Sequence, residues 1–186
     1  MIKLAGGGGG LGSVTTNATL TGAGTGASPL SVAGEPLPYF QQGSLIASTS
    51  LAAANDVMIS GFVLPYSLTF SNINVMVFTA DAVGLYDLGI YSKAGALLAH
   101  VGAQSLPATG FQTFPIVGGA QTLAPGLYAF GWTGNANAAA LNQDSGALIV
   151  WIFNGNVATS VAGVLPSSVG ALAIAVHQFP LFFFLD

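Results

Sequence analysis

The sequence predicts an all-β protein, an antiparallel sandwich that follows an extended N-terminal arm. From Pro38 onward, apolar runs recur about every 8 to 14 residues and are separated by Gly, Pro, Asn or Asp. Several of these runs alternate apolar and polar side chains, as half-buried strands do. A helix is nearly absent, since residues 51–55 offer one short turn at most. Residues 1–36 contain mostly Gly, Thr, Ala and Ser, so they hold too little apolar mass for a core.

The arm, residues 1–36, is predicted to be extended. Its five successive glycines, residues 6–10, lose the most backbone entropy on ordering, which favours a linker. No Lys-Ser or Lys-Thr pair follows them, as a phosphate-binding loop requires. The β-branched residues that follow predict brief strands that need a partner, the alternative being a disordered leader. The apolar side chains available for attachment are Leu11, Val14, Leu20, Leu30 and Val32.

The sandwich, residues 37–186, is predicted to contain about ten strands. The alternation within residues 66–78 changes parity at Ser71 and Asn72, which predicts a bulge or bend there. A turn carrying Lys93 and Gly95 predicts a hairpin. The predicted strands are residues 45–50, 56–63, 66–78, 84–92, 97–102, 112–117, 126–133, 148–154, 172–177 and 180–185.

The composition predicts a chain that works in an assembly. Two of its 186 residues are Lys or Arg and six are Asp or Glu, whereas about a quarter of an average soluble domain is charged. The mean hydropathy is +0.72, yet Gly, Pro and polar residues interrupt every apolar run before the 18 to 20 residues or so of a membrane helix. The scarcity of Lys and Arg argues against nucleic acid as a partner. The first residues lack the apolar stretch of a signal peptide, so we expect no export by that route.

The sequence predicts no enzyme, cofactor or metal site. The chain has no Cys, which removes disulfides and thiol nucleophiles. His100 and His177 lie far apart without flanking acids, a pattern more typical of satisfied or interface histidines than of metal ligands. The acids, Asp81 and Asp87 among them, are single residues in turn contexts, which disfavours a glycosidase pair. No calcium-loop or G-x-S-x-G pattern occurs.

One segment, residues 132–144, is a candidate binding loop. It combines an indole with several amide side chains, and a second indole lies on the next predicted strand. Flat apolar faces and amides together are suited to sugars. The alternative is that both tryptophans are core or interface residues and that the loop is a solvated connection. The candidate glycan or receptor contacts are Trp132, Asn135, Asn137, Asn142, Gln143, Asp144 and Trp151.

The C-terminal run F-P-L-F-F-F-L-D, residues 179–186, is apolar on both strand faces, so both faces must be covered. A central sandwich strand or a strand between subunits would satisfy this, and Pro180 restricts it to a strand start or an edge. The low charge favours a subunit interface in a closed ring such as a trimer. The predicted interface residues are Phe179, Leu181, Phe182, Phe183, Phe184 and Leu185.

Residues 19–32 follow the pattern T-L-T-G-x-G-T-x-x-S-P-L-x-V throughout. The segment resembles a short module that recurs in phage tail-fibre and other virion proteins. The resemblance implies an attachment arm or an interdomain strand within an assembly of several chains.

Three further segments occur in a fixed order over residues 45–133: F-V-L-P-Y-S-L-T-F-S-N-I, then G-I-Y-S-K-A-G-A-L, then L-A-P-G-L-Y. They resemble the jelly-roll domain of many bacteriophage virion proteins. The resemblance implies a jelly-roll sandwich in a non-enzymatic virion protein that is assembled in the host cytoplasm. The leading expectation is a trimeric fibre or spike component that is attached to other virion proteins through residues 1–36. The alternatives are a capsid decoration (cement) protein at symmetry axes and a lectin-like module that binds host surface glycans.

Overall fold

A computed structural model describes residues 20–21, 31–32, 39–40, 47–143, 154–172 and 183–186. Throughout these ranges the regular elements are strands, and the strands pair antiparallel. The strands are β1 (Leu20–Thr21), β2 (Ser31–Val32), β3 (Tyr39–Phe40), β4 (Ala47–Ser50), β5 (Asp56–Leu64), β6 (Leu68–Phe70), β7 (Asn72–Thr79), β8 (Asp81–Ser92), β9 (Leu97–His100), β10 (Gln104–Leu106), β11 (Gly110–Pro115), β12 (Gln121–Leu123), β13 (Gly126–Gly134), β14 (Ala140–Gln143), β15 (Asn154–Thr159) and β16 (Phe183–Leu185).

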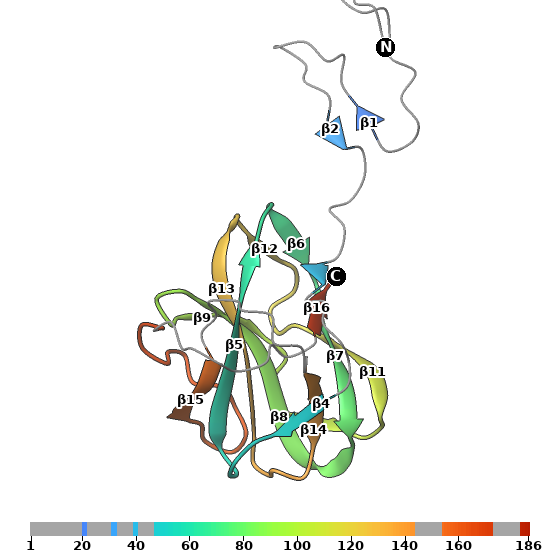
Figure 1. The fold of residues 1–186 in the computed structure, drawn as a ribbon, viewed down its shortest axis with the longest axis vertical. Helices are drawn as coiled ribbons and strands as arrows, with labels where there is room; N and C mark the ends of the chain where they lie inside the picture. The colour runs from blue at the N-terminus through green and yellow to red at the C-terminus, as the bar shows by residue number, and fades with distance from the viewer. Residues whose placement is uncertain (1–19, 22–30, 33–38, 41–46, 144–153, 173–182) are drawn as a thin grey trace, which may run out of the picture. The chain divides into compact units, whose positions relative to one another are not determined.

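Two sheets form a sandwich-like arrangement (Figure 1). The β8 sheet has the order β10-β8-β13-β5-β15, with β9 also paired to β8. The β7 sheet has the order β3-β16-β7-β14-β4, with β11 also paired to β7. The chain passes repeatedly from one sheet to the other, for example from β7 to β8 and from β13 to β14. The predicted all-β antiparallel sandwich is confirmed.

The main core lies between the two sheets and is rich in aromatic rings. Phe183 of β16 stacks on Phe130 of β13 with ring centroids 4.5 Å apart, and meets the edge of Phe62 of β5 at 5.0 Å. Alternation explains the choice of side chains: in β7, Ile73, Val75 and Val77 are buried at every second position. Burial of such large apolar side chains contributes about 1.5–3 kcal/mol each.

A second, smaller core lies on the other face of the β8 sheet. It contains Val57 and Ile59 of β5 and Tyr91 of β8, covered by Leu165 and Leu172. We call residues 160–172 the cover segment. Backbone hydrogen bonds fasten it to the β8–β9 hairpin, because the N–H of Leu97, Val169 and Leu172 donate to the carbonyls of Ser167, Gly95 and Lys93. Gly95 has φ +83°, and a Cβ there would overlap the carbonyl oxygen of Gly170, so only glycine fits.

The chain divides into two compact units, Met1–Pro36 and Leu37–Asp186. Within the first unit, β1 and β2 pair so that Leu20 lies opposite Val32. Leu11, Val14 and Leu30 lie outside the described residues. The module T-L-T-G-x-G-T-x-x-S-P-L-x-V therefore starts and ends in two short strands that pair with each other.

Several strand boundaries agree with the sequence prediction. The expected irregularity at Ser71 separates β6 from β7, and residues 51–55 contain a turn with Asn55 at φ 67°. Strands β10, β12 and β14 were not predicted, because three or four residues give too little alternation. Predicted strand 148–154 overlaps the described residues only at Asn154, and predicted strand 172–177 only at Leu172.

Candidate interaction surface

Trp132, the first residue of the predicted binding loop, is a core residue. It is 0% exposed, and its ring stacks on Tyr86 with centroids 6.2 Å apart. The assignment of Trp132 to a glycan-binding face is therefore wrong. The period of two explains its position: Trp132 and Phe130 belong to the same face of β13, which packs into the main core. Asn142 is also buried, at 5% exposure, so it is not a surface contact either.

Asn135 and Asn137 are the candidate contacts of that loop whose side chains are exposed within the described part of the chain. The Oδ1 of Asn135 accepts a hydrogen bond from the N–H of Leu85 at 2.9 Å, so this amide holds the loop against β8. The side chain of Gln143 and both Asp144 and Trp151 lie outside the described residues.

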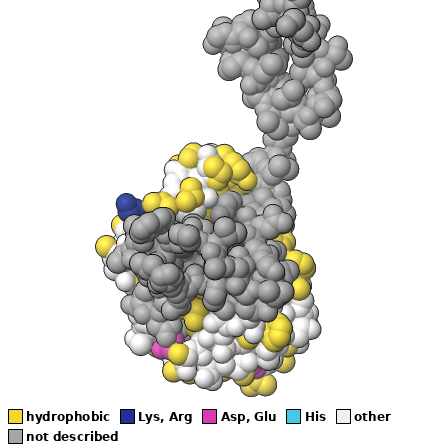
Figure 2. Space-filling model, in the orientation of Figure 1, with side chains coloured by type: hydrophobic (Ala, Val, Ile, Leu, Met, Phe, Trp, Pro, Cys, Tyr) yellow, Lys and Arg dark blue, Asp and Glu magenta, His cyan; other side chains and the backbone are white. Residues whose placement is uncertain are grey.

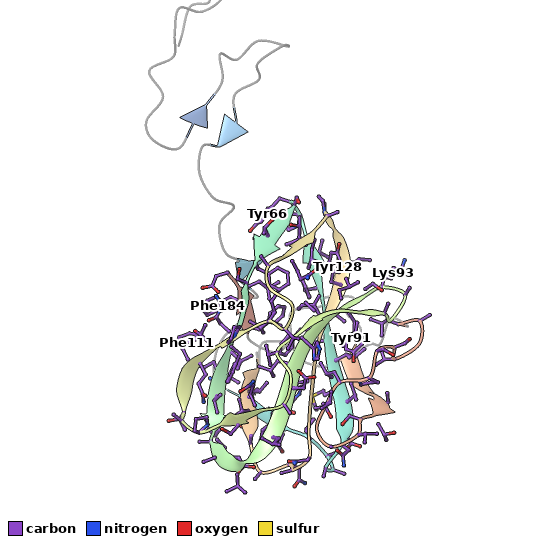
Figure 3. The ribbon with its side chains drawn as sticks, turned by 180° about the vertical axis from the view of Figure 1, so that it is seen from behind. Tyr66, Tyr91, Lys93, Phe111, Tyr128 and Phe184 are labelled. Carbon is purple, nitrogen blue, oxygen red and sulfur yellow. The ribbon has the colours of Figure 1, made fainter. Side chains whose placement is uncertain are left out.

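The C-terminal strand β16 also differs from its predicted role. Phe183 and Leu185 are 0% exposed and pack between the sheets, so their assignment to an oligomer interface is wrong. Phe184 points to the opposite face of the β7 sheet, where its ring meets the edge of Phe111 from β11 at 5.9 Å (Figure 3). Phe179, Leu181 and Phe182 lie outside the described residues.

A buried carboxylate links β8, β9 and the cover segment. Asp87 is 0% exposed, and its Oδ2 accepts hydrogen bonds from Nδ1 of His100 at 2.9 Å and from the N–H of Leu165 at 3.0 Å. Nearby, the hydroxyl of Tyr91 donates to the carbonyl of Pro166 at 2.8 Å. Burial, followed by the charge of Asp87, raises the pKa of Tyr91. Sequence reasoning missed the Asp87–His100 pair because the two residues come from adjacent strands of a hairpin.

A second acidic residue organises the start of β8. The Oδ1 of Asp81 accepts from the N–H of Val83 and of Gly84, both at 3.0 Å, and its Oδ2 accepts from the hydroxyl of Tyr86 at 2.7 Å. These bonds, led by the one from Gly84, lower the pKa of Asp81. Burial, reinforced by the bond to Asp81, raises the pKa of Tyr86 to about 12. The Tyr86 hydroxyl also accepts from the N–H of Ala139 at 3.0 Å, so the group joins β8 to the segment that leads into β14.

Within the described ranges, no group of three or more His, Cys, Asp or Glu residues is placed to hold a metal ion. Nor does the same part of the chain contain a helix that is long and apolar enough to cross a membrane.

Exposed aliphatic side chains occur near the start of β8 and in the cover segment. Val83 is 89% exposed and Val161 is 82% exposed, the highest values among the large apolar residues that the structure describes. Leu85 and Val164 are each 39% exposed. We call these four residues the aliphatic surface. The described residues that are visible in Figure 2 are mostly hydrophobic or uncharged, and charged side chains occupy only small patches among them.

The turn that carries Val161 and Val164 lies against β8 at Leu85. Residues 161–164 form a tight turn in which the N–H of Val164 donates to the carbonyl of Val161 at 3.1 Å. A Cβ at Gly163 would lie 2.5 Å from the carbonyl oxygen of Leu85, so the turn lies directly on the backbone of β8. The N–H of Gly163 donates to Oδ1 of Asn55 at 3.1 Å, which fixes the turn.

Comparison with protein-family models, with curated proteins and with solved structures finds no match for this chain. The fold defines the class of this protein as an all-β antiparallel sandwich. In its described part, Asp81 and Asp87 accept hydrogen bonds from the protein itself, and Val83 and Leu85 near the start of β8 are exposed.

Proposed function

We propose that this chain is a non-enzymatic structural component of a bacteriophage virion, a trimeric fibre or spike subunit attached through residues 1–36. The observation that supports the proposal most is an almost uncharged chain that exposes aliphatic side chains, Val83 and Val161 above all. Monomeric soluble proteins cover themselves with charge and avoid apolar patches. Eight charged residues in 186 do not provide that cover.

The division of the chain supports an anchored subunit. Residues 1–36 and 37–186 are separate compact units, and the first carries the segment that resembles the virion module. A sandwich with its own core can serve as the projecting part, while the arm binds other virion proteins.

The polar groups support a structural role over catalysis. A catalytic acid or base must reach a substrate, whereas the Oδ2 of Asp87 is occupied by the bonds from His100 and Leu165 inside the protein. The oxygens of Asp81 are used in the same way by Val83, Gly84 and Tyr86. Both acids stabilise strands and segments, so we assign no reaction to them.

A capsid decoration protein is the second candidate, because short uncharged chains suit a protein that lies flat on neighbouring subunits. A lectin-like module is the weakest candidate, since the burial of Trp132 leaves the loop with the exposed amides of Asn135 and Asn137 but without that aromatic face.

Deleting residues 1–34 tests the proposal. We expect the truncated protein to remain a folded oligomer with about three times the mass of the truncated chain in light scattering, and to be absent from purified particles that incorporate the full chain. Normal incorporation of the truncated protein would overturn attachment through the arm. In a cryo-electron reconstruction, density at capsid symmetry axes would support the decoration role, and density projecting from a tail or vertex would support the fibre role.

A further inference from the structure

We propose that the oxygens of Asp87, Thr133 and Ser160 bind a small monovalent cation, of the size class of sodium, beneath the cover segment. This site does not depend on the proposed virion role. The sequence predicts no metal site, because one carboxylate and two hydroxyls from distant parts of the chain form no recognisable motif. All three residues are more than nine-tenths buried, with exposed fractions of 0%, 0% and 8%.

One oxygen of the Asp87 carboxylate has no partner in the part of the chain that the structure describes. Its Oδ2 accepts the bonds from His100 and from the N–H of Leu165, whereas the buried Oδ1 accepts none. A buried carboxylate oxygen without a donor or a counter-ion destabilises the folded state. We therefore expect Oδ1 to bind something that carries a hydrogen-bond donor or a positive charge.

The strand register places Thr133 beside this carboxylate. In the pairing of β13 with β8, Thr133 lies directly opposite Asp87, so both side chains share the face of the β8 sheet that the cover segment covers. The cover segment bonds to both of them: Oγ of Ser160 lies 2.6 Å from Oγ1 of Thr133, and the N–H of Leu165 donates to Asp87. Residues 160–165 thus close over the oxygens of these three side chains.

The protons of the two hydroxyls are already used within the protein. Thr133 donates its proton to the carbonyl of Asp56 at 2.7 Å. A hydroxyl has one proton, so Ser160 must be the donor in its contact with Thr133. Both hydroxyls, like Oδ1 of Asp87, are left with lone pairs only. Buried acceptors without a free donor suit a cation, and oxygen atoms are the ligands that hard cations prefer.

The charge of Asp87 favours a monovalent cation over a water molecule. Lys93, the one Lys or Arg in the described ranges, is exposed just after the end of β8 (Figure 3), and six residues of extended chain span about 20 Å. The bond from His100 requires only a neutral imidazole. One monovalent cation would neutralise the single carboxylate, whereas sites for divalent cations usually contain more carboxylates.

The test measures the melting temperature of the full chain in sodium chloride and in tetramethylammonium chloride of equal ionic strength. The measurement is made at about pH 8, where an ordinary imidazole is neutral. Sodium that binds only the folded state stabilises it by mass action, so about ten times its dissociation constant should raise the melting temperature by about 3–5 °C. Tetramethylammonium is too large to enter between these side chains. Equal melting temperatures in the two salts would overturn the proposal.

The variant Asp87→Asn separates the cation from a merely structural role of the carboxylate. Its amide keeps an oxygen for His100 and Leu165 and places an NH₂ group where Oδ1 lies, so it supplies the missing donor itself. We expect this variant to fold and to melt at the same temperature in both salts. The matched control is Asp81→Asn, which changes an acid outside the site and should keep the sodium effect. A sodium effect that persists in Asp87→Asn would exclude Asp87 as a ligand.

Two further variants test the hydroxyl ligand and the charge of the imidazole. Ser160→Ala removes one oxygen and should weaken sodium binding severalfold. His100→Gln can donate the same bond but cannot carry a charge, so it should keep the sodium effect of the wild type. A sodium effect that appears only in His100→Gln would mean that the imidazolium neutralises Asp87 in the wild type, and the proposal would be wrong.

A crystal structure obtained in sodium chloride provides a direct measurement. We expect an atom beneath the cover segment whose distances to Oδ1 of Asp87 and to the hydroxyl of Ser160 are shorter than about 2.7 Å, the usual length of an O–H···O hydrogen bond. An atom at ordinary hydrogen-bond distances, together with equal melting temperatures in the two salts, would be a buried water and would contradict the cation site.

Discussion

The C-terminal strand β16 and the aliphatic surface place apolar residues in opposite environments. The strand belongs to the most apolar run of the sequence, yet Phe183 and Leu185 are fully buried within one chain. The aliphatic surface comes from a β-strand start and a Gly-containing turn, and Val83 and Val161 remain almost fully exposed. Apolar density along a sequence therefore indicates burial, but it does not say whether a chain's own core or a partner provides it.

Replacing Phe183 in β16 should have the largest effect on stability, and it tests whether this strand serves the core of a single chain. We expect Phe183→Ala to lower the free energy of unfolding by about 3–5 kcal/mol, because the cavity removes the stacking on Phe130 and the edge contact with Phe62. Urea denaturation measures this. Self-association of the protein that remains folded should not change; a loss of association with no loss of stability would assign the strand to a contact between copies.

The hydrogen bonds of Asp87, which hold the cover segment, should contribute less to the free energy of unfolding than Phe183 does. We expect Asp87→Ala to cost about 1–3 kcal/mol, since it leaves the buried N–H of Leu165 without its acceptor and removes the bond from His100. Hydrogen exchange should show faster exchange in the cover segment than in β5. His100→Ala is a suitable comparison, because it keeps the bond to Leu165, and we expect a smaller loss. Equal exchange rates in wild type and Asp87→Ala would exclude this role of the carboxylate.

The smallest effect should be the pH dependence at the start of β8. The raised pKa of Tyr86, about 12, means that the unfolded chain loses its phenolic proton first. Stability from this group is complete below about pH 10 and declines as pH rises toward 12, by on the order of 1 kcal/mol. The lowered pKa of Asp81 acts oppositely: its contribution is present above the ordinary aspartate pKa of 3.8 and is lost as pH falls through the lower pKa of the folded state.

Thermal unfolding across pH 8 to 12 measures the alkaline effect, and ultraviolet absorbance follows phenolate formation. In Tyr86→Phe the alkaline decline should be weaker, while the burial-raised pKa of Tyr91 still contributes a part. A decline of the same size in both proteins would mean that Tyr86 does not cause it.

The sequence allowed the alternating strands to be predicted because their pattern is local. The burial of Val57 and Ile59 in β5, the run around Phe130 in β13 and the break at Ser71 all follow from a period of two and from turn residues. Trp132 lies two residues after Phe130 in β13, so the same period of two predicts that its side chain also enters the core.

What could not be predicted depends on contacts between distant segments. The cover segment has no regular period, so its attachment through Leu165 to Asp87 has no local signal. The aliphatic surface likewise exists only because the turn at Gly163 lies on Leu85. The mismatch between high hydropathy and low charge predicts association, but it does not locate the residues that would take part.

The cover segment contains both Val161 and Leu165, one exposed in the aliphatic surface and the other buried in the second core. A partner that binds Val161 and Leu85 together therefore binds the state in which this segment is closed over the β8 sheet. Mass action then links assembly to folding. Where such a partner is another copy of the chain, the melting temperature should increase with protein concentration, and the segment that seals one subunit would be held shut by its neighbours.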